Sequence, residues 1–305
     1  MKNIRNLIPR LSPRWAPYVF VAPFVVLFLV FGLFPLLFSF TLAFAEWQPA
    51  AGFESMKFVG LQNFAFALHD AWFWKSLGNT LWLALLAGLP QHLVAIPLAV
   101  FIHGHYSRLR NAVVGAFFVP YITSTVAMSI LFMAVFSTHY GMLNQLLQWL
   151  HLSSNAIDWL GDPEQVKTSI GSIVFWRYVG FNTVLYLAAI QAISADLYEA
   201  ALMDGAKPVQ SFWYITLPSL RPVIYFAVTL SVIGGLQLFD EAFIMTSGQG
   251  GPDQAGLTAA LYMYREAFDF DDFGGASAMS WILFALVSAL TALTHWLFQP
   301  PKGSV

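Results

Sequence analysis

The chain has 305 residues, of which 58% are hydrophobic, 17% are aromatic and only 10% are charged, and its net charge is −2. Soluble domains carry about 25% charged residues, so this composition is typical of a membrane protein, and it gives no indication of nucleic-acid binding. The chain has no cysteine, which excludes disulfides, thiolate metal sites and a cysteine nucleophile.

The N-terminal segment is basic and leads into a long apolar run. Its first 14 residues contain no acid and four basic side chains: Lys2, Arg5, Arg10 and Arg14. A secretory signal could begin in this way, but its apolar region needs only about 7–15 residues. The run here extends from Tyr18 to Phe44. It is therefore predicted to be a retained membrane span.

Six apolar segments reach the roughly 20 residues that a helix needs to cross the hydrocarbon core of a bilayer. They are residues 18–44, 79–102, 111–136, 170–192, 222–247 and 276–298. The two-residue alternation of membrane barrels is absent. The expected fold is therefore an all-α domain of six transmembrane helices (18–298), between an N-terminal segment (1–17) and a short tail (299–305).

The placement of lysine and arginine predicts the orientation of these spans. A cytoplasmic N-terminus puts nine of them inside and four outside. The inner set is Lys2, Arg5, Arg10, Arg14, Arg108, Arg110, Lys207, Arg221 and Lys302; the outer set is Lys57, Lys75, Lys167 and Arg265. Both termini and the loop 193–221 are then cytoplasmic.

That inner loop contains an unusually polar stretch, "EAALMDGAKPVQSFWYITLP". Asp196 and Glu199 have the spacing of an N-cap and an acid at the third helical position. Gly205 is suited to end this helix in a left-handed turn, and Pro208 falls where a second helix could start. The pattern predicts a helix, a glycine turn and a second helix at the inner membrane surface.

The second half of the loop is more apolar and is expected to end at Pro218, before the fifth span. Phe212 and Trp213 would be costly to expose to water unless they meet lipid or a partner. Ala200 and Ala201 are small enough for another body to approach closely. The residues alone leave two roles open, an amphipathic loop resting on the bilayer and a docking surface.

The spacing Glu-Ala-Ala, three residues, Gly, nine residues, Ile, one residue, Leu-Pro resembles the EAA loop of ABC-importer permeases. The matching positions are Glu199, Ala200, Ala201, Gly205, Ile215, Leu217 and Pro218, and Asp204, Ala206 and Pro222 also agree. Other segments resemble the carbohydrate branch of that family: "FVGLQNF" (58–64), "YGMLN" (140–144), "FDEAFIMTSGQGGP" (239–252) and "LYMYREAF" (261–268). One departure is "SGQGGP", where the family more often has an uninterrupted glycine run.

This resemblance implies the type I importer fold in a bacterial inner membrane. The chain would be one of two permease subunits and would form the pathway for a sugar, oligosaccharide or polyol. A solute-binding protein would deliver that substrate, and two copies of an ATP-binding subunit would hold ATP and magnesium. Glu199 would be the polar anchor to the ATPase, Gly205 the turn, and Ala200 and Ala201 close-packing residues.

The sequence before each lysine is consistent with ATP binding by a separate subunit. A phosphate-binding P-loop requires a glycine directly before its lysine. No lysine after Lys2 follows a glycine: these are Lys57, Lys75, Lys167, Lys207 and Lys302. We therefore expect no enzyme activity and no cofactor in this chain.

Polar side chains within the spans are candidates for the substrate pathway. Tyr178, Asn182 and Tyr186 are spaced i, i+4, i+8 in the fourth span. Gln237, Asp240 and Glu241 are spaced i, i+3, i+4 and should share one helical face in the fifth. Aromatic faces and hydrogen-bonding groups together suit a sugar.

Each of these candidates could instead have a purely structural role. Asn182 can bond between helices, and Asp240 and Glu241 can lie near water at the outer end of their span. Arg177 can pair with an acid such as Asp240. His103 and His105 lie in a basic turn without a third ligand nearby, so no metal site is expected.

Two alternatives from other classes remain. An ion-coupled secondary transporter could use Asp240 and Glu241, but it leaves the EAA loop unexplained. An intramembrane enzyme would need a nucleophile and a base, and the sequence shows no recognisable pair of this kind. The glycine-rich stretch 247–253 lacks a lysine and is expected to be an outer turn near the mouth of the pathway or near the binding protein.

Overall fold

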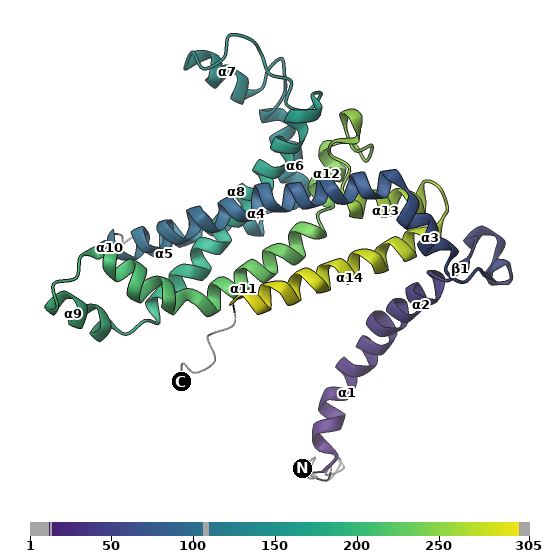
Figure 1. Cartoon of the computed structure of the whole chain (residues 1–305), viewed down its shortest axis with the longest axis horizontal. Helices are drawn as coiled ribbons and strands as arrows, with labels where there is room; N and C mark the ends of the chain where they lie inside the picture. Colours follow the sequence, from purple (N-terminus) through teal and green to yellow (C-terminus); the bar gives the residue numbers. More distant parts are fainter. Residues whose placement is uncertain (1–11, 13, 106–109, 299–305) are drawn as a thin grey trace, which may run out of the picture.

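The computed structural model describes residues 12, 14–105 and 110–298, and most of them lie in helices (Figure 1). The predicted tail and most of the N-terminal segment lie outside the described residues, as do five of the basic residues used to predict orientation. These five are Lys2, Arg5, Arg10, Arg108 and Lys302.

Within the described residues, five helices are long and apolar enough to cross a membrane. They correspond to the first, second, fourth, fifth and sixth predicted spans, which confirms the helical membrane fold. They are Ala16–Leu42 (α1 Ala16–Phe28, a π-helical turn Leu29–Leu33 and α2 Phe34–Leu42), α4 (Ala71–His105), α8 (Pro163–Gln191), Pro208–Met245 and α14 (Phe273–Phe298).

The third predicted span differs from a single straight helix. It consists of α5 (Arg110–Ile122) and α6 (Thr125–Val135), whose axes are bent by 93° at the short break between them. Pro120 cannot donate a backbone hydrogen bond near the end of α5, and Ser124 has an extended ψ of 127°. The helix therefore stops and restarts in a new direction. Counting the bent pair as one span gives six.

The fifth span begins earlier than predicted. α10 (Pro208–Ser211), a π-helical turn (Phe212–Thr216) and α11 (Leu217–Leu236) form one continuous helical segment. The expectation that Pro218 ends the second loop helix is therefore wrong. A proline ring clashes with the carbonyl four residues earlier in a regular helix. Here that position lies within the wider π-helical turn, and Pro218 sits in the first turn of α11.

α4 and α8 pack side by side at the centre of the molecule (Figure 1). α5 packs on α8, α11 contacts both α4 and α14, and α13 (Ala259–Phe268) lies on α14. Gly180 allows α5 to approach α8, because a side chain there would overlap the backbone carbonyl of Phe117. Two large apolar clusters fill the interfaces among these helices.

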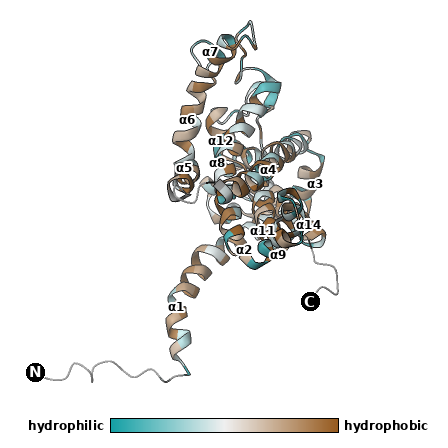
Figure 2. Ribbon diagram, turned by 90° about the vertical axis from the view of Figure 1, so that its left-hand side faces the viewer, coloured by the Kyte–Doolittle hydropathy of each residue, from teal (hydrophilic) through white to brown (hydrophobic). Residues whose placement is uncertain are grey.

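The first half of the first span, α1 and the π-helical turn, stands apart from the bundle (Figures 1 and 2), whereas α2 contacts α14. No residue of α1 or of the π-helical turn after it is buried, and Phe20 and Phe31 are 79% and 75% exposed. In a bilayer such a surface meets lipid or another membrane subunit.

Short elements cover the ends of the spans. β1 (Ala45–Glu46) pairs antiparallel with β2 (Lys57–Phe58), and α3 (Gln62–His69) leads into α4. α7 (Met142–Trp149) lies far from the bundle, beyond α6 (Figure 1). After α11 the chain breaks at residues 237–239 and continues as α12 (Asp240–Met245), which packs against α6.

Candidate functional site

A cavity of about 210 Å³ lies among α4, α5, α8 and α11. Aromatic side chains form part of its wall, and Gln91 and Asn182 contribute amide groups. Both amides belong to residues that are almost fully buried, at 3% and 2% exposed. The lining consists of Leu83, Ala84, Ala87, Gly88, Gln91, Tyr121, Val174, Tyr178, Phe181, Asn182, Leu230, Ser231, Gly234, Gly235 and Leu238.

Each amide has one atom without a hydrogen-bond partner in the described part of the chain. Gln91 donates through Nε2 to Ser231 Oγ at 2.8 Å, but its Oε1 is unpaired. Asn182 has an unpaired Nδ2. Leaving a buried polar group unsatisfied costs about 1–3 kcal/mol. Both residues line the cavity, and an unpaired acceptor with an unpaired donor is a combination that a hydroxyl group can satisfy.

A polar group behind the cavity holds one wall in place. The hydroxyl of Tyr186 and Nδ1 of His92 are hydrogen-bonded at 2.8 Å, and Nε2 of His92 lies 3.0 Å from Ser231 Oγ. Tyr186 is fully buried and does not line the cavity. Of the three residues predicted as one stripe, the structure thus brings Tyr178 and Asn182 to the cavity and places Tyr186 behind it.

The three polar residues predicted on one face of the fifth span do not share a face. Gln237 caps the end of α11, whereas Asp240 and Glu241 lie in the first turn of α12. The prediction is wrong because the backbone leaves the helical region between them: Phe239 has φ −131° and ψ −60°. Gln237 and Asp240 are exposed, and none of the three lines the cavity.

Arg177 forms a buried ion pair, but with Glu241 and not with Asp240. Its Nη1 lies 2.6 Å from Glu241 Oε1, and the two residues are 8% and 4% exposed. The guanidinium also lies over the ring of Tyr178, 5.7 Å from its centre. The pair therefore joins α8 to the segment that follows the helix break.

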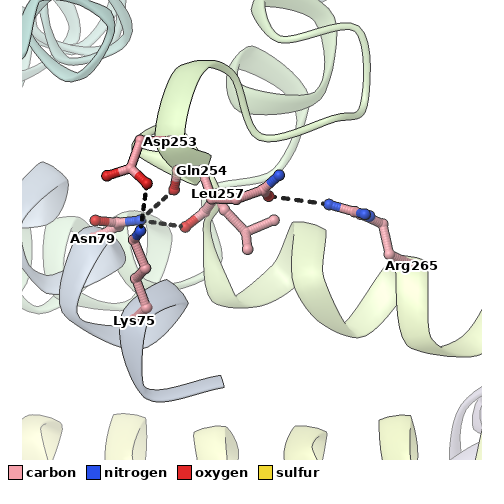
Figure 3. A network of polar contacts seen from close by, with 6 residues as sticks. All are labelled: Lys75, Asn79, Asp253, Gln254, Leu257 and Arg265. Atoms are coloured by element: carbon pink, nitrogen blue, oxygen red, sulfur yellow. Dashed lines mark hydrogen bonds and ion pairs between the residues drawn. The ribbon is translucent and has the colours of Figure 1, made fainter. Parts of the chain in front are cut away.

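The glycine-rich stretch forms a loop that is held on the N-terminal end of α4 (Figure 3). Lys75 forms an ion pair with Asp253 at 3.2 Å, and Asn79 Nδ2 donates to the carbonyls of Gln254 and Leu257. Arg265 of α13 donates to the side chain of Gln254 at 3.1 Å. The loop is thus fixed between two helices.

A cluster of oxygen-bearing side chains lies next to this loop. The hydroxyl of Tyr262 donates to Asp70 Oδ2, and Glu266 is one helical turn further along α13. Burial raises the pKa of the Glu266 carboxyl, and the neighbouring charge of Asp272 raises it further. Burial also raises the pKa of Tyr262. Folding therefore shifts the protonation equilibrium of Glu266 toward the neutral form.

The polar loop 193–221 folds as a helix, a glycine turn and a second helix. The first helix, α9, covers Ala195–Met203 and is capped by Ser194, whose Oγ accepts from the amide of Asp196. The expectation that Asp196 is the cap is therefore wrong. Ser194 is the last residue with extended backbone angles, and Asp196 already lies in the first turn. Gly205 has φ +80°, as the turn requires, and α10 starts at Pro208.

No residue of α9 is buried, and only Tyr198 and Ala201 are half-buried. At its end, Leu202 and Met203 are 72% and 86% exposed. The residues predicted to contact an ATPase divide into two groups: Glu199, Ala200, Asp204, Gly205 and Pro218 are exposed, whereas Ala201, Ile215 and Leu217 are half-buried.

Residues 95–299 match the family described as "Binding-protein-dependent transport system inner membrane component". The chain belongs to this family. It is 32% identical over 297 residues to the arabinooligosaccharides transport system permease protein AraP of Bacillus subtilis, covering 96% of this chain and 91% of that protein. It is 35% identical over 286 residues to the lactose transport system permease protein LacF of Rhizobium radiobacter, covering 93% and 94%.

Solved structures agree with this assignment. A crystal structure of a bacterial ABC transporter involved in the import of the acidic polysaccharide alginate superposes with a TM-score of 0.80 at 26% identity, covering 93% of this chain and 95% of that one. A bacterial alginate ABC transporter in complex with its alginate pentasaccharide-bound periplasmic protein gives 0.77 at 25%, covering 92% of each. The protein is thus the permease of an ABC importer, a multi-pass protein of the inner membrane.

Sequence reasoning missed the contribution of the second span to this permease's cavity. Gln91 and His92 follow Pro90 within an otherwise apolar run. An adjacent polar pair in a membrane span is itself a signal, because such groups face a cavity or a partner. Ser231 gave no comparable signal, since a lone serine is ordinary in a membrane helix.

Proposed function

We propose that this permease passes a sugar, an oligosaccharide or a related polyol, and that the cavity among α4, α5, α8 and α11 is part of its pathway. The observation that carries the proposal is the pair of buried amides with an unpaired acceptor on Gln91 and an unpaired donor on Asn182. Tyr121 and Tyr178 line the same cavity and offer aromatic faces to a sugar ring. The names of the relatives, which concern arabino-oligosaccharides and lactose, support a carbohydrate.

The loop 193–221 is proposed to be the cytoplasmic docking element for a separate ATPase, which places both termini in the cytoplasm. Its first helix buries nothing in this chain and ends in exposed apolar side chains, as expected of a surface that a partner covers. Glu199 is exposed and free to serve as the polar anchor. ATP and magnesium would bind to that partner, since no lysine after Lys2 follows a glycine.

Two further partners complete the proposed complex. A second permease subunit would cover part of the exposed first span, where residues 16–33 bury nothing in this chain. An extracytoplasmic solute-binding protein would deliver the substrate, as the periplasmic protein in the alginate complex carries its pentasaccharide. Ion-coupled transport through Glu241 is disfavoured, because the charge of that carboxylate is already balanced by Arg177.

Reconstitution in vesicles tests this function. The permease is co-expressed with its partner permease, ATPase and binding protein, and uptake is measured with lactose, arabino-oligosaccharides and alginate oligosaccharides. We expect uptake of at least one of these sugars. This uptake should require ATP on the side of the membrane that carries the ATPase, and the binding protein on the opposite side. Accumulation by the permease alone, driven by a proton or sodium gradient, would refute the proposal.

A further inference from the structure

A hydrogen-bonded chain joins α9 to the start of the fifth span. The hydroxyl of Tyr198 in α9 lies 2.9 Å from Thr216 Oγ1, and Thr216 Oγ1 donates to the backbone carbonyl of Ser211 at 3.4 Å. A threonine hydroxyl has one proton to donate. When both bonds are formed, that proton goes to the carbonyl of Ser211, so Tyr198 is the donor of the first bond. The order is therefore Tyr198 to Thr216 to the carbonyl of Ser211.

The chain ends on an irregular turn. Ser211 immediately precedes the π-helical turn Phe212–Thr216, and Thr216 closes that turn. A π-helical turn within an α-helix leaves carbonyls poorly paired, and such turns occur frequently at functional sites. Thr216 is 4% exposed, so its hydroxyl has little access to water. The hydroxyl of Tyr198 thus reaches the one irregular turn between α10 and α11.

α9 has few other connections to the rest of the permease. It buries no residue, and a cavity of about 670 Å³ opens between it and the ends of α4 and α8. Tyr198, Glu199 and Thr216 all line this cavity. Within the described part of the chain, no other hydrogen bond or ion pair joins α9 to another helix, and the left-handed turn at Gly205 follows its end.

The helix that follows the π-helical turn leads to the cavity proposed for substrate. α11 extends from Leu217 to Leu236, and its distal half contributes Leu230, Ser231, Gly234 and Gly235 to the cavity wall. A displacement of α9 that is carried through Thr216 would therefore act on a helix that lines the pathway. Without this bond, α9 could pivot on its glycine turn while α11 stayed in place.

We propose that Tyr198 and Thr216 are positioning residues, which transmit the movement of α9 to the pathway helix α11 through the π-helical turn. This inference rests on the proposed docking of an ATPase at α9. It assigns the transmission step to two hydroxyl groups and not to the docking contacts themselves.

Variants that remove only a hydroxyl test the proposal in the reconstituted complex. Tyr198→Phe and Thr216→Val break the chain, whereas Thr216→Ser keeps it. Tyr214→Phe is the matched control, because Tyr214 is in the same π-helical turn but is 80% exposed. For each variant we would measure the amount of assembled complex, binding-protein-stimulated ATP hydrolysis, and uptake of the sugar from the above panel that wild type transports best.

The expected signature is a lower ratio of sugar taken up to ATP hydrolysed. An ordinary hydrogen bond contributes enough to change an equilibrium by roughly two- to tenfold, so Tyr198→Phe and Thr216→Val should lower that ratio by a similar factor. Assembly should stay at wild-type levels, and Thr216→Ser and Tyr214→Phe should keep the wild-type ratio. The double variant should lose no more than either single one, because both break the same chain.

Other outcomes overturn the inference. An unchanged ratio in both Tyr198→Phe and Thr216→Val would do so, as would a parallel loss of assembly, hydrolysis and uptake, which indicates only a structural bond. A wild-type complex that shows no ATP-dependent uptake would remove the proposed function itself, and this inference with it. The two failures are distinguished by the behaviour of wild type.

Discussion

Removing the charge of Glu241 should strongly destabilise the permease. Its carboxylate lies 2.6 Å from Arg177 Nη1, and both residues are buried, at 4% and 8% exposed. Breaking a buried ion pair by removing one partner costs about 3–5 kcal/mol, because the remaining charge is left without compensation. Glutamine keeps the shape of the side chain and an acceptor oxygen, so we place Glu241→Gln at the lower end, about 3 kcal/mol.

Thermal unfolding of the purified permease measures this effect. The unfolding entropy of about 2.1 cal/mol/K per residue gives roughly 0.64 kcal/mol/K for 305 residues, so a loss of about 3 kcal/mol in Glu241→Gln should lower Tm by roughly 5 °C. Asp240→Asn is the matched control, since the neighbouring carboxylate is exposed and should change Tm little. Replacing both partners, as in Arg177→Met with Glu241→Leu, removes the uncompensated charge and should restore most of the loss.

The double variant decides whether the reasoning is right. If Glu241→Gln melts within about 2 °C of wild type, the pair is hydrated and the burial argument fails. If the double variant is less stable than Glu241→Gln, the loss comes from disturbed packing between α8 and α12 and not from an unpaired charge. Either result would refute the interpretation of this contact as a buried electrostatic link.

Three further predictions follow from other parts of the structure. Gly205→Val should abolish coupled uptake while membrane insertion stays normal. The reason is the backbone conformation, since φ is +80° and no atom obstructs an added side chain. Asparagine tolerates this conformation, so Gly205→Asn should retain uptake in the same assay. Asn182→Leu should raise the sugar concentration for half-maximal uptake at least about fivefold by removing a donor from the cavity; unchanged concentration dependence would exclude Asn182 from the pathway. The raised pKa of Glu266 means that its contribution to stability is fully present below the usual carboxyl pKa and is lost as pH rises through the raised value. Glu266→Gln should therefore gain stability relative to wild type between about pH 4 and 8, measured as Tm; a constant difference across that range would contradict the burial of this carboxyl.

The spans were predictable from sequence because only their length and hydropathy matter. The breaks were not, since hydropathy contains no information on direction. Residues 111–136 are mostly apolar, and the short polar run Thr123, Ser124 and Thr125 at the break does not specify the 93° turn after Ile122. The same applies to residues 237–239, where Leu238 and Phe239 are apolar but the helix does not continue. Pro120 pointed to a disturbance in the third span, but a membrane proline is compatible with both a kink and a straight continuation.

The site was predictable where one regular helix carries the residues. Tyr178 and Asn182 lie on α8 at i and i+4, and both line the cavity as helical spacing predicts. Helical spacing did not predict the position of Glu241, because the helix is interrupted before this residue. The cost of an isolated buried charge led to the expectation that Arg177 pairs with an acid such as Asp240. Which of two adjacent acids does so depends on about 100° of helix rotation, which no sequence pattern specifies.

The positions of the two breaks give an independent argument that the cavity belongs to the pathway. Backbone that leaves the helix at membrane depth is tolerated only where it is buried in protein or lines a water-filled cavity, and transporters place substrate sites at such discontinuous helices. Tyr121 lies just before the break after α5, and Leu238 lies within the break after α11. Both line the same cavity. The segments beyond the breaks, α6 and α12, pack against each other. A simple packing defect does not explain why two helices are interrupted or why both interruptions lie at the same cavity. A pathway that opens beside two interrupted helices explains both observations.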